Sequence, residues 1–302
     1  MTQEPMTLVI PYVSGIAYLR ETLASVARLD GTHWRAIVSD NTRDPAESAL
    51  AKDAVAALGD SRITVRSFDR HVDICASFNR SMECAPTDLV TLLHSDDRIM
   101  PGYATAIADL ASRYPDAAVY YCGARIIGGD GRPMFSFVDF VKRFLIRGQR
   151  GLPTVLSGRH GVEALARGNF IMSPTVCFRL SRLGDARWLP EFVQVADLEL
   201  WTRVLFNGGT LVGTSTVAYE YRRHSAQSTA LTNKTFLRYR EEAAVYNLTA
   251  DRAKARGWKT AERIARGKLV TRLHVLYDIA VDLMRLDLRT AGSKFGFLLK
   301  LR

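Results

Sequence analysis

The 302-residue sequence lacks the features of a membrane-spanning, secreted or disulfide-rich protein. No stretch approaches the roughly 18 consecutive apolar residues that a membrane span requires. The N-terminus has neither the basic region nor the apolar core of a signal peptide. The four cysteines, at positions 75, 84, 122 and 177, show no CxxC spacing and no companion histidine cluster. We therefore expect a cytoplasmic protein whose cysteines are reduced and mostly buried.

Two glycine-rich phosphate-binding motifs are also missing. Neither GxGxxG, the dinucleotide fingerprint, nor GxxxxGKS/T, the P-loop, occurs in the chain. A nucleotide bound by this protein would therefore be held by side chains and a metal ion instead of a glycine-rich backbone cradle.

The residues that are present give an ordinary soluble composition, 47% hydrophobic and 24% charged, but the charge is uneven. Residues 1–230 carry 25 Lys and Arg against 24 Asp and Glu, whereas residues 231–302 carry 16 against 7. We expect a neutral domain over 1–230 and a basic helical region over 231–302. The basic region either meets something acidic, such as anionic lipid, nucleic acid or an acidic partner, or is a solvated helical face.

Short apolar runs alternate with helical patterns over the first hundred residues. The runs predict buried strands and the patterns between them predict helices, which together imply parallel pairing and right-handed crossovers. The sequence therefore predicts a doubly wound α/β sheet. The predicted strands are 7–13 (stopping at Pro11), 34–39, 63–67 and 89–93, and the helices are 16–29, 45–58 and 74–85.

The patterns that follow are mixed. Residues 135–168 fit no clear period, and we interpret them as a functional loop or lid. The remaining predicted elements are a helix at 102–113, a strand at 118–122, a hairpin at 126–134 with an Asp-Gly turn, an extended segment at 170–180, a helix at 198–206, and one or two strands over 210–221.

Adjacent carboxylates, Asp96 and Asp97, follow the run 89–95. Because the carboxyl ends of parallel strands share one sheet edge, we expect them beside Asp40 and segment 71–73, which follow the second and third strands. A divalent cation is the simplest way to keep two neighbouring carboxylates ionised, and oxygen ligands suit Mg²⁺ or Mn²⁺. A solvated turn is the alternative for an isolated pair, but the convergence of several polar groups favours a site.

Asp197 and Glu199 lie at the start of the predicted helix 198–206. A carboxylate there could act as a general base that takes the proton of an attacking hydroxyl. The alternative for Asp197 is a helix N-cap.

The C-terminal part, 231–290, is predicted to be helical. Apolar residues recur there at alternating spacings of four and three, which indicates a packing seam within the chain or, alternatively, between two copies in a homodimer. We expect packing within the chain. The seam residues are Leu269, Leu273, Leu276, Ala280 and Leu283. The last residues, 294–302, mix aromatic, aliphatic and basic groups, as interfacial membrane segments do, although an ordinary docked tail would also fit.

Seven short segments follow one another along the chain: Val-Ile-Pro-Tyr (9–12), Val-Ser-Asp-Asn (38–41), Ser-Phe-Asn-Arg-Ser-Met-Glu-Cys-Ala (77–85), Leu-Leu-His-Ser-Asp-Asp (92–97), Asn-Phe-Ile-Met-Ser-Pro-Thr-Val (169–176), Ala-Asp-Leu-Glu-Leu-Trp-Thr-Arg (196–203) and Tyr-Arg-Arg-His (221–224). In this order they resemble family 2 glycosyltransferases of the GT-A fold, over about residues 6–230. The resemblance implies a mixed, mainly parallel Rossmann-like sheet with helices on both faces, followed by a C-terminal helical extension. It also implies inverting transfer from a nucleotide-diphosphate sugar.

The resemblance also implies roles for the donor-binding positions. Pro11 and Tyr12 would line the nucleotide pocket, and Asp40 would read the nucleobase. Asp96 and Asp97 match the DxD-type element, one facing the ribose and the other the metal. Further donor-binding candidates are His71, Asn79, Arg222 and Arg223, of which the arginines could pair with phosphate.

The transfer chemistry rests on two further matches. Asp197 matches the general base, and His224 matches a residue near the diphosphate or the metal, for which Asp96, Asp97 and His224 are the candidate ligands. The expected cofactor is Mn²⁺ or Mg²⁺. The sequence departs from the family pattern at Val13-Ser14, where an Asn is usual, at His94 in place of the first Asp of DxDD, and at Ala196 in place of a Glu.

The expected partners are a UDP- or dTDP-sugar donor, a glycan or lipid-linked glycan acceptor, and an anionic membrane surface reached through the tail, with no nucleic acid. Localisation would be cytoplasmic, peripheral at the inner membrane face. Two alternatives remain at this point. One is a sugar-phosphate nucleotidyltransferase, although Ile10–Ala17 has only Gly15 and lacks its usual glycine-rich basic loop. The other is a non-catalytic lipid or nucleic-acid binder acting through the basic tail.

Overall fold

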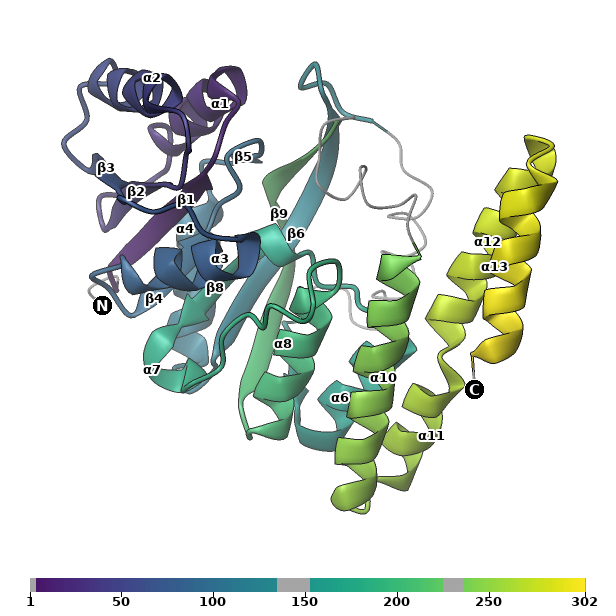
Figure 1. Cartoon of the computed structure of the whole chain (residues 1–302). Coiled ribbons are helices and arrows are strands. Elements are labelled where there is room, and N and C mark those ends of the chain that lie inside the picture. The colour runs from purple at the N-terminus through teal and green to yellow at the C-terminus, as the bar shows by residue number, and fades with distance from the viewer. Residues whose placement is uncertain (1–3, 135–152, 225–235, 302) are drawn as a thin grey trace. The chain divides into compact units, whose positions relative to one another are not determined.

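A computed structural model describes residues 4–134, 153–224 and 236–301 (Figure 1). The chain forms two compact units. The first comprises residues 1–155, 170–191 and 209–225, and the second comprises residues 156–169, 192–208 and 226–302. The sequence-based division at residue 230 stays a prediction.

The first unit is built on a mixed β-sheet with strand order β3-β2-β1-β4-β8-β6-β9-β5, and β7 pairs with β9 off this path. The neighbours β3, β2, β1 and β4 are parallel, as predicted, whereas β8 is antiparallel to both β4 and β6. The strands are β1 (Met6–Tyr12), β2 (Trp34–Asp40), β3 (Ile63–Ser67), β4 (Leu89–Leu92), β5 (Arg98–Ile99), β6 (Val119–Gly128), β7 (Thr154–Ser157), β8 (Val176–Arg179) and β9 (Thr210–Arg223).

Helices cover both faces of the β1 region. Alternate residues of β1, from Met6 to Tyr12, join one apolar cluster with residues of α1 (Ile16–Val26), α2 (Pro45–Ala56) and α4 (Tyr103–Arg113). Val9, between them, is also fully buried, on the other face. Helix α3 (Ile74–Glu83) contacts β1 and β4. Burial on both sides explains why the sequences of these strands are near-continuous apolar runs.

The first strand does not stop at Pro11, contrary to the sequence-based prediction. Pro11 pairs in register with Ser39, and β1 ends at Tyr12. Val9 accepts a hydrogen bond from Leu93 on the β4 side, so the missing N–H of Pro11 faces that same side. The β1–β4 ladder has already ended at Val9, so the proline removes no ladder hydrogen bond.

The second unit is helical. Within it, α6 packs against α8, α10 and α11, and α12 packs against α10 and α13. Its helices are α6 (Gly158–Arg167), α8 (Ala196–Phe206), α10 (Leu237–Ala255), α11 (Lys259–Gly267), α12 (Leu269–Met284) and α13 (Leu288–Lys300). Two short helices, η1 (Ser173–Thr175) and α7 (Leu180–Leu183), belong to the first unit. No helix in the described residues is long and apolar enough to cross a membrane.

Two predictions are corrected here. Residues 135–152 of the expected lid lie outside the described residues, but 158–167 form α6 and are not a loop. The pattern is obscured by Gly161, where an added Cβ would lie 2.9 Å from Leu205, so the glycine allows α6 to approach α8 closely. The predicted seam on α12 is not covered by the described chain, because Leu269, Leu273 and Leu276 are exposed.

Candidate active site

The carboxyl ends of β3, β2, β1 and β4 lie along one edge of the sheet of the first unit. The chain runs outward from β1 through β2 to β3 and then returns to the other side of β1 to form β4. Such a reversal leaves a crevice at the carboxyl ends of the strands, where open α/β sheets bind ligands. The loops after these four strands carry most of the sequence-predicted site residues.

Asp97 is fully buried just after β4. The Tyr219 hydroxyl donates to its Oδ2 at 2.9 Å, and the Arg222 backbone N–H donates to its Oδ1 at 2.7 Å. Burial and the neighbouring Asp96 raise the pKa of Asp97 well above its usual range, while these two hydrogen bonds oppose the rise. Asp97 therefore ties the β4 end to strand β9.

Asp96 is half-buried and is shared by two groups of potential ligands. His224 Nε2 lies 2.9 Å from Asp96 Oδ2. In addition, His94, Asp96 and Asp97 each offer one ligand atom, and these three atoms lie within 4.8 Å of one another. Burial lowers the pKa of His94, which keeps its ring in the neutral form that binds metal ions. The residues present therefore fit a divalent cation, and the mixture of carboxylate and imidazole suits Mn²⁺ better than Mg²⁺.

Arg222 does not have the predicted phosphate-binding role. Its side chain is fully buried, and it donates to Asp96 O at 2.7 Å, Gly129 O at 3.1 Å and Glu21 Oε2 at 2.5 Å. Its guanidinium lies 4.6 Å from the centre of the Tyr18 ring. These contacts fix the backbone of Asp96, so Arg222 positions the site. Arg223, its half-buried neighbour, stays a predicted phosphate ligand.

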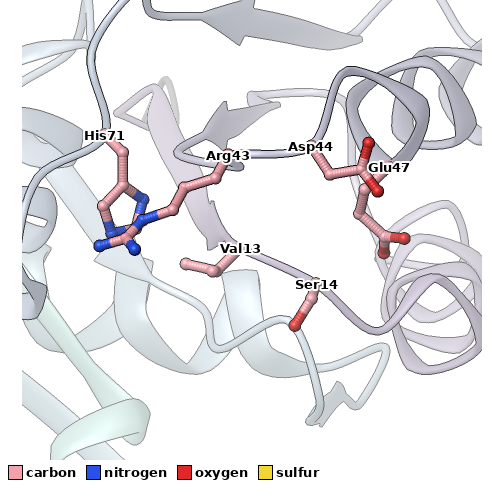
Figure 2. A pocket seen from close by; sticks show the side chains of 6 residues that line it. All are labelled: Val13, Ser14, Arg43, Asp44, Glu47 and His71. Atoms are coloured by element: carbon pink, nitrogen blue, oxygen red, sulfur yellow. The ribbon is translucent and has the colours of Figure 1, made fainter.

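A pocket of about 430 Å³ opens beside the ends of β1, β2 and β3. In Figure 2 the basic side chains of Arg43 and His71 lie on one side of it, and the carboxylates of Asp44 and Glu47 lie on the other. His71 was predicted from the sequence, and its Nδ1 lies 2.6 Å from Asn41 O, which holds the ring in place. Arg43 and Glu47 carry no motif, so the sequence alone did not single them out.

Two predicted pocket residues lie behind this surface. Tyr12 is fully buried, and its hydroxyl donates to Glu47, which also accepts the Gly15 N–H at 2.9 Å. The Tyr12 side chain thus orients Glu47, and the pocket wall after β1 is formed by Val13 and Ser14. Pro11 precedes them on the strand.

Asp40 ends β2 as predicted and is buried. Its carboxylate accepts from Ser48 Oγ at 2.5 Å, Thr42 N at 3.0 Å and Ser67 Oγ at 3.0 Å. Burial by itself would raise the pKa of Asp40, but the hydrogen bonds outweigh it and the pKa lies below its ordinary value. Asp40 is therefore held as a carboxylate at neutral pH.

Asn79 is hydrogen-bonded to the protein backbone. Its side-chain amide donates to Trp188 O at 2.9 Å and accepts from Trp188 N at 2.9 Å, so it is bound to the backbone of the segment after α7. Trp188 in turn packs edge-on against Phe78, whose ring stacks on His94. Asn79 thus supports the wall beside His94, and its role as a donor-binding residue stays a prediction.

Asp197 lies in the first turn of α8, in the second unit, and is half-buried. Its Oδ2 accepts from Asn169 Nδ2 at 3.1 Å, and its Oδ1 accepts from Leu198 N at 2.8 Å. It is not the N-cap of the helix, because Val195 occupies that position. The residues just before α8 are held by a different acid. The Glu241 carboxylate accepts the backbone N–H groups of Val193, Gln194 and Val195.

Glu199, one turn further along α8, is buried in an ion-pair network. Its carboxylate lies 2.8 Å from Arg203 Nη2 and 3.3 Å from Arg252 Nη1. Glu199 therefore binds α8 to α10 and is not an alternative base. The sequence placed both acids correctly at the helix start but offered no signal for Glu241 or Arg252.

Comparison with known proteins agrees with this geometry. Residues 7–170 match the family model "Glycosyl transferase family 2", and the chain belongs to this family. The membership decides against the nucleotidyltransferase and non-catalytic alternatives. A Mycobacterium tuberculosis protein described as "Uncharacterized protein MT1568" is 25% identical over 230 residues, which cover 73% of this chain and 67% of that protein.

Solved structures show the same fold. S. aureus TarS 1–349 in complex with UDP-GlcNAc has a TM-score of 0.59 at 14% identity, with 80% of this chain and 65% of that chain covered. The mannosyltransferase PcManGT from Pyrobaculum calidifontis, in complex with GDP-Man and Mn²⁺, has a TM-score of 0.60 at 14% identity, with 100% and 86% covered. This chain spans about two thirds of the TarS chain and most of PcManGT. These likenesses show that the mixed, mainly parallel sheet of the first unit has the GT-A fold.

Proposed function

We propose that this protein is an inverting glycosyltransferase that moves a sugar from a nucleotide-diphosphate donor to an acceptor hydroxyl. The observation that carries the proposal is the meeting of Asp96, His94 and His224 at the carboxyl edge of a GT-A sheet. Carboxylates and imidazoles gathered there provide a cation site at the place where this fold class receives a diphosphate.

The donor site of the proposal extends from the pocket to Asp96. Asp40 would contact the nucleobase, while His71 and Arg43 offer donors to the nucleotide from the pocket wall. UDP and GDP sugars in the TarS and PcManGT complexes support a nucleotide-sugar donor. Our first choice is a UDP- or dTDP-sugar.

Asp96 is the proposed principal metal ligand, with His224 or His94 beside it, and the buried Asp97 serves to position it. This assigns different roles to the two adjacent carboxylates. A divalent cation bound there supplies positive charge to the departing diphosphate. The Mn²⁺ in the PcManGT complex supports this choice of metal. Arg223 is the proposed phosphate partner in the chain itself.

The proposed transfer step is a single displacement at the anomeric carbon, with Asp197 as the general base. The acceptor oxygen forms a bond to that carbon as the bond to the diphosphate oxygen breaks, and the nucleoside diphosphate leaves with the bonding electrons. The Asp197 carboxylate takes the acceptor proton. One displacement inverts the anomeric configuration. Asn169 holds one Asp197 oxygen and so orients the base. The proposed acceptor is a glycan or a lipid-linked glycan.

A donor screen tests this proposal. The purified chain is incubated with UDP-, dTDP- and GDP-sugars in Mn²⁺, in Mg²⁺ or in EDTA, and release of nucleoside diphosphate is measured. We expect slow donor hydrolysis by one nucleotide class, supported by Mn²⁺ and abolished by EDTA. Hydrolysis that continues unchanged in chelator would contradict the metal role. No turnover of any nucleotide sugar, with or without glycan acceptors, would contradict the proposed function.

A further inference from the structure

The exposed face of α12 is entirely apolar. Every α12 residue that is exposed to solvent belongs to one stripe without a charged or amide side chain, about one third of the helix circumference wide. Leu273 is 56% exposed and Leu276 is 47% exposed, values typical of polar surface residues. The stripe, which we call the α12 face, consists of Leu269, Leu273, Leu276, Tyr277, Ala280, Leu283 and Met284.

The polar side chains of α12 point the other way, into the unit. Asp278 accepts the Tyr239 hydroxyl of α10, Asp282 lies 2.6 Å from Lys294 Nζ of α13, and Arg272 donates to Leu301 O. Figure 1 shows α12 and α13 packed side by side. The helix is thus oriented with its hydrogen-bonding groups inward and its apolar groups outward, which is the reverse of a surface helix.

The turn after α12 continues this apolar surface. Leu286 and Asp287 donate to the carbonyls of Leu283 and Asp282, the two hydrogen bonds of a Schellman C-cap. Glycine is the usual residue at the position of Leu286, because φ there is +60°. A leucine that is 83% exposed stands there instead and gains no burial from the described chain. Leu288, Phe295 and Leu299 of α13 are also exposed.

Charge decides between the two occupants that could cover such a surface. Residues 231–302 carry 16 Lys and Arg against 7 Asp and Glu. Arg285 and Arg289 are exposed on either side of the apolar turn, and Lys300 is exposed at the end of α13. A second copy would bring an equally basic unit against the first, whereas anionic lipid headgroups attract it. No described helix can span a bilayer, so the contact would be interfacial.

We propose that the α12 face, together with the turn at Leu286, docks the protein on an anionic membrane surface. Apolar side chains enter the headgroup boundary while Arg285, Arg289 and Lys300 contact lipid phosphates. The docking needs neither donor nor metal, so it stands apart from the proposed transfer reaction. It would give the enzyme access to an acceptor carried on lipid.

Vesicle flotation of the full chain tests this proposal. We expect the protein to float with phosphatidylcholine vesicles that contain phosphatidylglycerol, and much less with pure phosphatidylcholine or at high salt. The Leu273→Ser and Leu276→Ser variants should each weaken partitioning on the order of tenfold. The control is Leu248→Ser, at a 38% exposed position of α10 in the same unit, which should leave partitioning unchanged.

A second variant separates docking from folding. Leu286→Gly suits the left-handed backbone, so we expect its melting temperature to be unchanged or higher while vesicle binding falls. Equal flotation of all variants, or no flotation of the wild type, would overturn the proposal. So would sedimentation as a dimer that Leu273→Ser dissociates, because a second copy would then be the occupant. Nucleoside diphosphate release from donor, measured without vesicles, shows separately whether the proposed function holds.

Discussion

The two units depart from the usual apolar-inside, polar-outside arrangement in different ways. The first unit buries ionisable groups, Asp97, Arg222 and Asp40, and gives each of them hydrogen-bond partners. The second unit also buries partnered charge, at Glu199 and Glu241, but it leaves the leucines of α12 exposed to solvent. Buried charge is costly unless it is partnered, and exposed apolar surface is costly unless it is covered. The first departure marks a preorganised site and the second marks a docking surface.

The largest effect should come from Asp197, the one proposed catalytic residue of the second unit. We expect Asp197→Asn to lower the transfer rate by about 10²–10⁴-fold, since a general base contributes about that much. Donor binding should be unchanged, because the proposed donor groups all belong to the first unit. Steady-state kinetics and nucleotide titration measure the two quantities. Transfer at the wild-type rate would remove Asp197 from the mechanism.

Adjacent carboxylates in the first unit should separate into a structural and a ligand-binding residue. Asp97→Ala leaves the Tyr219 hydroxyl and the Arg222 N–H without their buried acceptor, so it should lower the free energy of unfolding by about 3 kcal/mol. Asp96→Ala removes a partly exposed contact with His224 and should cost less than about 1 kcal/mol while abolishing activation by Mn²⁺. Denaturant unfolding and metal titration of both variants check this. The assignment is wrong if Asp96→Ala causes the larger loss of stability and Asp97→Ala abolishes activation by Mn²⁺.

Glu241 tests how the second unit supports its catalytic helix. One oxygen of its carboxylate accepts three successive backbone N–H groups before α8. Glu241→Gln should therefore lower the free energy of unfolding by about 2 kcal/mol and reduce the transfer rate more than donor affinity. The exposed Glu191→Gln is the matched control. A stable variant with unchanged kinetics would show that the carboxylate does not position Asp197.

The smallest predicted effect is the pH dependence due to Asp40. Its pKa is lowered in the folded state, so its contribution to stability is complete above the unfolded-state pKa, near 4, and is lost as the pH falls through the folded-state value. Asp40→Asn should cost about 1 kcal/mol at pH 7 and show a shallower loss of stability below pH 4. Denaturant midpoints measured across this pH range test it. Parallel curves for the two proteins would contradict the prediction.

The sequence predicted the parallel strands β1 to β4 well because each of them is a short run between turns. The parallel pairing of these strands and the meeting of their carboxyl ends at one edge followed from the alternation of strands and helices, whereas the strand order comes from the structure. Packing details did not follow. Gly161 looked like a loop residue, and only the close approach of Leu205 explains why it belongs to a helix.

The candidate site was predictable in its location and less so in its roles. Asp96, Asp97, Asp40 and His71 lie where strand topology placed them. Roles depend on which way a side chain points and on what it meets across the sheet. Arg222 looked like a phosphate ligand until its contacts with Glu21 and Gly129 showed it buried. The α12 spacing was visible in the sequence, but periodicity does not tell whether a stripe faces the core or the solvent.

Electron paramagnetic resonance of Mn²⁺ tests the central claim most directly, because the signal of the free ion disappears when the ion is bound. We predict that the wild-type protein with UDP or another nucleoside diphosphate removes more of the free Mn²⁺ signal than the nucleotide alone does, and that Asp96→Ala removes no more than the nucleotide alone. A wild-type protein that binds nucleotide equally well in Mn²⁺ and in EDTA, and that in the absence of EDTA removes no more free Mn²⁺ signal than the nucleotide alone, would contradict the account.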